Sequence, residues 1–303
     1  SKNLTRLVFL ATSMNGTLST RLGELTNLRH LLIDNGYFTG SIPTELSSLS
    51  LLSELSLQRN HLEGSIPSVL PPNLQSLFLA SNFLTGALPG SLGSLPYPSR
   101  VYLGRNILTG TIPESWFSSS SLDGLEALDL PLNFLNGTIP AAIATTPQRI
   151  KHLILGNNEF TGTLPEVWNA PQLGKLSLRN FTRIDSTIPT GLGNLVGLKT
   201  LDLRHAQYRG TIPTEFRNLT DLEDLQLAGN QLTGTLPTFL AELDHLKRIY
   251  VEHNNLTGSL EFLCNRSCEV DRLVADCSDA RRITSCSCCF ICCGANRRCI
   301  RNT

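Results

Sequence analysis

The nine cysteines have the clearest covalent chemistry in this 303-residue chain. All of them lie between Cys264 and Cys299, and the preceding 263 residues contain none. Such a cluster either forms disulfides or holds a metal ion, and the CxCCxxCC run fits both. The segment has no histidine, and disulfides stabilise segments that lack a large core. We therefore expect disulfides and no metal.

The cysteines expected to pair are Cys264, Cys268, Cys277, Cys286, Cys288, Cys289, Cys292 and Cys293. Because nine is odd, one thiol stays free or pairs with another chain, and we expect it to be Cys299.

Seven asparagines stand in N-x-Ser/Thr sequons, which are acceptor sites for N-glycosylation in secreted proteins. Such triplets also arise by chance where Asn-Gly-Thr recurs. Together with the cysteines they indicate an oxidising, extracellular or cell-surface location. The candidate sites are Asn3, Asn15, Asn136, Asn180, Asn218, Asn255 and Asn265.

No arrangement of residues indicates catalysis. The six histidines are spread singly along the chain, and there is no Gly-rich phosphate loop, HExxH or GxSxG sequence. We expect a protein that is not an enzyme and needs no cofactor. The 25 basic and 25 acidic residues cancel, so the charge does not favour a nucleic acid partner. No stretch is apolar enough to span a membrane, and Ser1-Lys2-Asn3 does not begin a signal peptide.

A glycine recurs about every 24 residues along most of the chain. A period of this length predicts a solenoid, in which each repeat buries its apolar face against its neighbours. The glycines are Gly16, Gly40, Gly64, Gly86, Gly110, Gly137, Gly162, Gly210, Gly234 and Gly258, and Ser186 takes one further place.

Within one repeat the residue types predict the local structure. Leu55 and Leu57 alternate with a polar residue, which is the period of a short strand. The side-chain amide of Asn60 can then bond to backbone groups of neighbouring turns, and the same residue in successive repeats would form a ladder. Gly64 permits a turn that a side chain would hinder.

These repeats resemble the plant-type leucine-rich repeat family, whose unit reads LxxLxLxxNxLxGxIPxxLxxLxx, over about residues 4–263. The resemblance implies an α/β repeat solenoid: a right-handed superhelix of about 11 repeats with a concave parallel β-sheet. It also implies a second short strand around each Gly-x-Ile-Pro and short helical or 3₁₀ turns such as 43–49 and 213–219. We expect a solenoid over residues 1–263 and a disulfide-rich cap over 264–303. The tail is similar to that of leucine-rich repeat proteins of diatoms and related algae.

Several repeats depart from the pattern. Thr12, Gly36 and Ala206 occupy the asparagine position, so we expect the ladder to break there. Around Ser186 an inserted residue predicts a bulge, and 118–121 is expected to form a protruding loop in a 27-residue repeat.

Residues between the leucines of the concave strands face solvent. Phe78, Tyr102 and Ile154, with Arg59 and Arg105 beside them, predict a mixed aromatic and basic patch. Tyrosine and arginine are enriched at binding hot spots, which favours a protein, peptide or glycan contact. Ordinary scatter of exposed apolar residues is the alternative.

A hydroxyl residue follows nearly every repeat glycine and forms an outer column. Three interpretations stay open: the β-propensity of threonine, a row of sites for sugars, and an ice-binding plane. The clearest members of the column are Thr111, Thr138, Thr163, Thr187, Thr211 and Thr235.

These patterns favour a non-enzymatic secreted or cell-surface glycoprotein that serves as a scaffold for protein or glycan interactions. An alternative is a structural glycoprotein that assembles end to end. The repeat frame begins directly at Leu4, so either further residues precede it or another chain packs on its strand edge in self-association. Ice binding through the hydroxyl column is a further alternative.

Overall fold

The computed structural model describes residues 3–11, 13–117, 120–145, 148–184, 186–264, 272–276, 283–285, 291–293 and 299–301. Five of the cysteines discussed above, Cys268, Cys277, Cys286, Cys288 and Cys289, lie outside these residues, as do Asn265 and Thr12. The chain divides into two compact units, Ser1–Glu159 (unit 1) and Phe160–Thr303 (unit 2), and each is described by itself.

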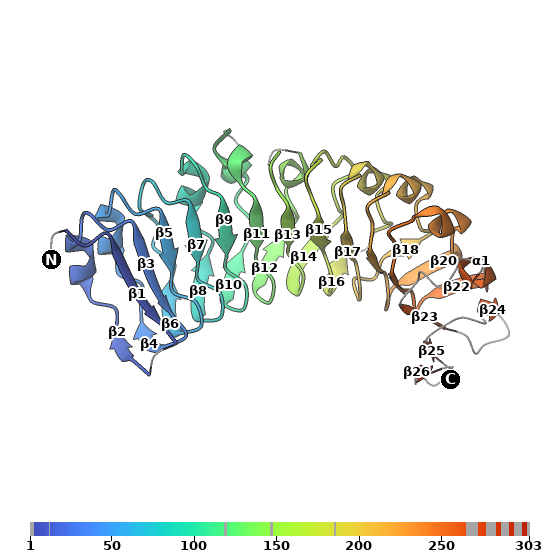
Figure 1. The fold of residues 1–303 in the computed structure, drawn as a ribbon, viewed down its shortest axis with the longest axis horizontal. Helices are drawn as coiled ribbons and strands as arrows, with labels where there is room; N and C mark the ends of the chain where they lie inside the picture. The colour runs from blue at the N-terminus through green and yellow to red at the C-terminus, as the bar shows by residue number, and fades with distance from the viewer. Residues whose placement is uncertain are drawn as a thin grey trace. The chain divides into compact units, whose positions relative to one another are not determined.

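In unit 1 one short strand per repeat builds a parallel sheet, called the first sheet (Figure 1). The strands pair in chain order and in register, so that Phe78 lies opposite Tyr102. They are β1 (Arg6–Leu10), β3 (His30–Asp34), β5 (Glu54–Ser56), β7 (Ser76–Phe78), β9 (Arg100–Tyr102), β11 (Ala127–Asp129) and β13 (His152–Ile154). This arrangement confirms the short strands predicted from the leucine pattern and the parallel sheet that the family resemblance implies.

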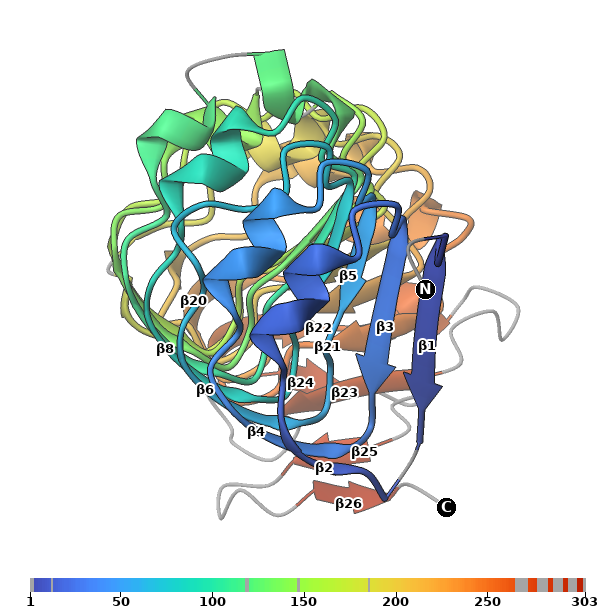
Figure 2. The same cartoon turned by 90° about the vertical axis from the view of Figure 1, so that its left-hand side faces the viewer.

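A second parallel sheet runs through the Gly-x-Ile-Pro segments of unit 1. Figure 2 shows β1, β3 and β5 on one side of the coil and β2, β4 and β6 on another. The strands are β2 (Asn15–Thr17), β4 (Tyr37–Gly40), β6 (His61–Ser65), β8 (Phe83–Ala87), β10 (Ile107–Gly110) and β12 (Phe134–Gly137), and β14 (Asn158–Gly162) spans the unit boundary.

In most of the repeats a short 3₁₀ helix follows the second-sheet strand, and it usually begins after a proline. Those expected at 43–49 and 213–219 are present as η2 (Thr44–Ser48) and η8 (Thr214–Asn218). The others are η1 (Thr20–Glu24), η3 (Gly90–Ser94), η4 (Glu114–Phe117), η5 (Ser120–Gly124), η6 (Ala141–Ala144), η7 (Thr190–Asn194) and η9 (Thr238–Glu242). The expected loop at 118–121 lies partly outside the described residues, and the backbone of Ser120 and Ser121 belongs to η5.

Unit 2 repeats the same plan. Its first sheet contains the parallel strands β15 (Lys175–Ser177), β17 (Thr200–Asp202), β19 (Asp224–Gln226), β21 (Arg248–Tyr250), β23 (Arg272–Asp276) and β25 (Ile291–Cys293), followed by the antiparallel β26 (Cys299–Arg301). Its second-sheet strands are β16 (Phe181–Ile184), β18 (Arg209–Gly210), β20 (Gln231–Thr235), β22 (Asn255–Ser259) and β24 (Ile283–Ser285), and α1 spans Glu261–Cys264. Because β23 pairs with β21, strand pairing continues past residue 263.

The repeated asparagines form the ladder that the sequence predicts. The Nδ2 of Asn82 donates to the carbonyl oxygens of Leu57 (2.9 Å) and Leu79 (3.1 Å), and its Oδ1 accepts from the N–H of Leu62 at 3.1 Å. Each amide thereby satisfies backbone groups of its own repeat and of the previous one. Asn60, Asn106, Asn133, Asn158, Asn230 and Asn254 are buried in the same way.

The ladder breaks where other residue types replace asparagine. At Ala206 the neighbouring Asn230 compensates, because its Oδ1 accepts from the N–H groups of both Ala206 and Tyr208. A further break, not expected from the sequence, lies at Phe181. This residue is fully buried and packs edge to face on Phe160, with ring centroids 5.6 Å apart.

The repeat without glycine interrupts the second sheet of unit 2. Strand β16 ends at Ile184, and Ser186 is buried with its hydroxyl donating to the carbonyl of Thr187. Thr187 makes an isolated bridge to Arg209 before regular pairing resumes between β18 and β20. The irregularity lies where the sequence predicts a bulge.

Candidate ligand-binding surface

The outward residues of the first sheet in unit 1 form one continuous row. Strand pairing places Phe78 opposite Tyr102, Tyr102 opposite Asp129, and Asp129 opposite Ile154. All four are partly exposed. The ring of Phe78 meets that of Tyr102 edge to face, with centroids 5.1 Å apart and an interplanar angle of 67°. The three aromatic and apolar residues of the predicted patch therefore share one row, which we call the aromatic row.

On three of these four strands the next outward residue is small, and on β11 it is Pro131. Ala80 follows Phe78, Gly104 follows Tyr102, and Gly156 follows Ile154. A Cβ at Gly104 would stand 2.9 Å from the Oδ1 of Asp129, so this position accepts no side chain without a shift. Ala80 is partly exposed, whereas Gly104 and Gly156 are buried, and Asp129 and Pro131 pack against Gly104.

The two arginines of the predicted patch lie beyond the small residues, at the turns that follow the strands. Arg59 and Arg105 both adopt positive φ, at 54° and 58°, and both are exposed. The Nη1 of Arg59 donates to the Oδ1 of Asn35 at 3.4 Å. Within the described residues, neither guanidinium lies over a ring. The predicted patch is thus an aromatic row with a separate basic edge.

Two carboxylates, Asp34 and Glu54, lie on β3 and β5, the strands that precede Phe78 in the first sheet. Asp34 accepts hydrogen bonds from the hydroxyl of Ser56 (2.7 Å) and from the N–H of Gln58 (2.9 Å). Burial raises the pKa of Asp34 above its ordinary value, and the hydrogen bond from Ser56 opposes that rise. Nearby, the Nδ1 of His30 lies 3.1 Å from Glu54. The unit 1 surface therefore combines aromatic, acidic and basic groups.

The first sheet of unit 2 carries ion pairs that the sequence analysis did not identify. Asp202 accepts from the Nε and Nη2 of Arg204 at 2.9 and 3.1 Å, and Arg179 lies 3.8 Å from it. The hydrogen bond to Asp202 raises the pKa of Arg204. On the next strands, Asp224 pairs with Arg248 at 3.1 Å. In the sequence, these ion pairs are indicated by acidic and basic residues that occupy the same outward columns in successive repeats.

Some acceptor oxygens beside these pairs have no hydrogen-bond donor among the described residues. They are Oδ1 of Asp224, Oε1 of Gln226 and Oε2 of Glu252. Burial raises the pKa of Glu252. Burial and the charge of Arg204 lower the pKa of His205. Burial is thus the largest cause of the pKa shift of both Glu252 and His205.

The hydroxyl column has a packing role. The Cγ2 methyl of Thr211 lies 3.1 Å from where a Cβ would stand on Gly234 of the next repeat. The same relation joins Thr111 to Gly137, Thr187 to Gly210, and Thr235 to Gly258. The hydroxyl residue after one glycine thus packs in the space left by the next glycine. The six predicted members, Thr111, Thr138, Thr163, Thr187, Thr211 and Thr235, are all exposed.

The structure also shows where the candidate glycosylation sites lie. Asn15, Asn136 and Asn255 are exposed on second-sheet strands, and Asn218 is exposed at the end of η8. Asn3 is exposed near the start of the described chain. Asn180 differs, because it is only partly exposed and adopts φ +53° at a turn.

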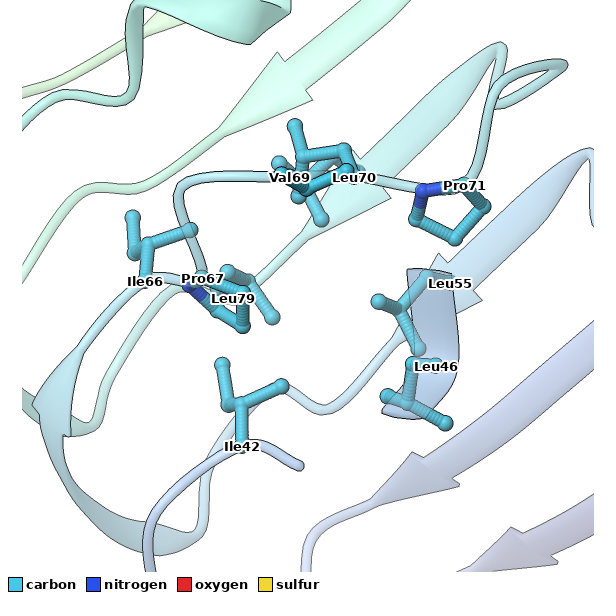
Figure 3. Close-up of a pocket in the computed structure, with 10 residues that line it drawn as sticks. Ile42, Leu46, Leu55, Ile66, Pro67, Val69, Leu70, Pro71 and Leu79 are labelled. Carbon is cyan, nitrogen blue, oxygen red and sulfur yellow. The ribbon is translucent and has the colours of Figure 1, made fainter. Parts of the chain in front are cut away.

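Unit 1 also contains two hollows. The first is apolar and lies between the coils around Ile42, Ile66 and Leu70 (Figure 3). Its volume of about 10 Å³ is no larger than one water requires. The second is an open hollow of about 560 Å³ lined by Tyr97, Asp123, Glu126 and Arg149 among others. It lies beside the strand ends and not on the aromatic row.

Within the described residues, no group of three or more His, Cys, Asp or Glu side chains could hold a metal ion. The same part of the chain contains no helix long and apolar enough to cross a membrane.

The leucine frame, the two parallel sheets and the asparagine ladder define the fold as a leucine-rich repeat solenoid. Leucine rich repeat family models match residues 196–256 and 73–95. A sequence search of curated proteins gives no match.

Several solved structures share this fold. A plant peptide hormone receptor, RGFR1 in complex with RGF2, is 30% identical over 90% of this chain and 43% of its own, with a TM-score of 0.82. The TDR receptor is 29% identical over 88% of this chain and 46% of its own (TM-score 0.81). The Arabidopsis receptor kinase HAESA, in complex with the peptide hormone IDA and the co-receptor SERK1, is 27% identical over 90% and 45% (TM-score 0.78). The chain thus spans less than half the length of these receptor chains.

A plant ice-binding protein also matches, at 24% identity over 93% of this chain and 84% of its own, with a TM-score of 0.57. This likeness concerns the fold alone.

Proposed function

We propose that the protein is a non-enzymatic, extracellular or cell-surface binding scaffold, and that the aromatic row of unit 1 contacts an extended peptide or protein segment. The observation that carries this proposal is the partly exposed Phe78–Tyr102 pair, held in register on adjacent strands. The peptide-bound receptor structures that share the fold support a peptide or protein ligand.

The geometry suits a segment that crosses the strands. The rings of Phe78 and Tyr102 lie on adjacent strands, which are about 4.8 Å apart, and both rings are partly exposed. Large aromatic side chains held rigidly on strands contribute contact area at a low entropy cost. The exposed Arg59 and Arg105 would then meet acidic groups or a carboxylate of the ligand.

A selection from a library of random linear peptides tests this site. Selected peptides are measured by calorimetry against the wild type and against the Phe78→Ala/Tyr102→Ala variant. We expect the double variant to weaken binding at least about tenfold. Tyr97→Ala is the matched control, because Tyr97 is 71% exposed and lies off the row. Unchanged affinity in the double variant would reject the site assignment.

The sequence-based alternatives gain no specific support over ligand binding. The methyl groups of Thr111, Thr187, Thr211 and Thr235 pack against the space at the next glycine, which gives these threonines a structural role.

The disulfide-rich cap over 264–303 stays a proposal, supported by the density of cysteines. Mass spectrometric mapping of peptides without reduction tests it, and free thiols throughout the segment would reject it.

A further inference from the structure

A second row of exposed side chains, four of them aromatic, lies on the second sheet of unit 1. Each member is the first residue of its strand, and together they occupy β4, β6, β8, β10 and β12. We call them the outer row, and they are Tyr37, His61, Phe83, Ile107 and Phe134. Tyr37, Phe83 and Phe134 are 57%, 50% and 49% exposed. An exposed apolar stripe of this length on a soluble protein calls for something that covers it.

The rings at one end of the row cover one another in part. Tyr37 stacks on His61 with centroids 5.8 Å apart, and His61 stacks on Phe83 at 5.7 Å. Phe134, at the other end, makes no ring contact within the described part of the chain. Its ring is therefore available to another group.

An N-glycosylation sequon stands beside this free ring. Asn136 follows Phe134 by two residues on β12, and Leu135 between them is buried while both neighbours are exposed. Residues i and i+2 of a strand project from the same face, about 6.6 Å apart along it. A sugar attached to the amide of Asn136 would start next to the ring of Phe134.

The other sequons with described surroundings lack this arrangement. Ser13 stands two residues before Asn15, whose aromatic neighbour Tyr37 lies across on the next strand and not on the same one, and His253 stands two before Asn255. Phe216 precedes Asn218 by two residues, but it is fully buried in η8. The pairing of an exposed aromatic ring with a sequon asparagine on one strand face therefore singles out Asn136.

We propose that Asn136 carries an N-glycan whose first sugars pack on Phe134 and continue over Ile107, covering this end of the outer row. The apolar face of an N-acetylglucosamine ring packs on an aromatic ring, and its hydroxyls stay in water. Thr109, opposite Phe134 on β10, and Thr111, which follows the end of β10, are exposed and provide hydrogen-bonding groups for the following sugars. The proposal shares with the binding site of the first sheet only the extracellular setting.

A double-mutant cycle tests the contact in protein secreted from a glycosylating eukaryotic host. Occupancy of Asn136 is measured by glycopeptide mass spectrometry, and Tm is measured for the wild type, Phe134→Ala, Asn136→Gln and the double variant. We expect each single variant to lower Tm by about 2 °C or more, and the double variant to lower it no further. Thr138→Ala, which removes the sequon but keeps Asn136, should behave like Asn136→Gln.

Three further measurements separate the glycan contact from a merely structural effect. In protein made without N-glycosylation, Phe134→Ala should leave Tm unchanged. Binding of a hydrophobic dye should rise in Asn136→Gln and stay constant in Asn218→Gln, the control sequon whose preceding aromatic residue, Phe216, is buried. An unoccupied Asn136, additive Tm shifts, or an equal effect of Phe134→Ala with and without glycans would each overturn the proposal.

Discussion

The Oδ1 of Asn82 accepts a hydrogen bond from the backbone N–H of Leu62 in the preceding repeat, at 3.1 Å. The same side chain donates to carbonyl groups on both repeats. Asn82 is 6% exposed, so water cannot replace these bonds. The amide therefore joins two coils through groups that would otherwise be buried without partners.

Replacing Asn82 with alanine should destabilise unit 1 by about 3 kcal/mol, because it leaves three buried backbone groups with fewer partners. The free energy of unfolding in urea measures the change. Asn73→Ala is the control, because the exposed Asn73 makes one hydrogen bond, to the carbonyl of Ser50. That variant should lose about 0.5 kcal/mol, and equal losses would contradict the ladder's role.

The contact between Thr211 and Gly234 predicts a coupling between neighbouring repeats. Gly234→Ala places a Cβ at φ +78° and 3.1 Å from the Thr211 methyl. The left-handed conformation alone costs about 1–2 kcal/mol, and the contact adds to it. Gly110→Ala has a similar φ of +77° but meets Ala87 at 3.6 Å, and should cost less.

The Thr211→Ser background separates the two contributions to this cost. Serine keeps the hydroxyl and removes the methyl group, so Gly234→Ala should then cost about as much as Gly110→Ala does in the wild type. The free energies of unfolding in urea give both differences. If Thr211→Ser leaves the cost of Gly234→Ala unchanged, the methyl packing is not what keeps glycine at this position.

The main frame of the fold follows from the sequence because the same residue types recur with a nearly constant period. The leucines and the ladder asparagines occupy equivalent places in successive coils, so each repeat supports the assignment of the next. The replacement of a ladder asparagine by Phe181 was not predicted, because the adjacent Asn180 can be mistaken for the ladder residue.

The surface could be predicted only in part. Strand register follows from the leucines, so the line from Phe78 to Ile154 was predictable. The place of Arg59 was harder to derive, because the positive φ at the following turn directs the chain away from the sheet. Ion pairs such as Asp224 with Arg248 depend on rotamers of side chains in different repeats, which the sequence pattern does not specify.

Glu252 should make the stability of unit 2 depend on pH. Burial raises its pKa in the folded protein, so folding favours the protonated form. The associated stability is present below the ordinary pKa of 4.5 and is lost as the pH rises through the folded value. The free energy of unfolding should therefore decrease less between acidic and neutral pH in Glu252→Gln than in the wild type.

Urea unfolding at a series of pH values measures this slope. Glu242→Gln is the control, because Glu242 is an exposed residue of η9. Asp34 also has a pKa raised by burial and contributes a slope of the same sign, so only differences between variants are informative. A wild-type slope retained in Glu252→Gln would show that burial of Glu252 does not affect folding.

Asp202 should be the ion-pair residue of unit 2 with the largest effect on stability. Its side chain is 9% exposed and accepts two charge-assisted hydrogen bonds from Arg204. Asp202→Ala should cost about 2–3 kcal/mol, because hydrogen bonds to charged groups contribute more than neutral ones and Arg204 would lose its partner. Glu223, which lies 3.7 Å from Lys199 and 3.6 Å from Lys247, has a 35% exposed side chain and is the matched control. Glu223→Ala should cost about 0.5 kcal/mol and less still in 1 M salt, since exposed pairs are screened. The loss in Asp202→Ala should persist at that salt concentration, and a loss that salt abolishes would mean that Asp202 acts only as a surface charge.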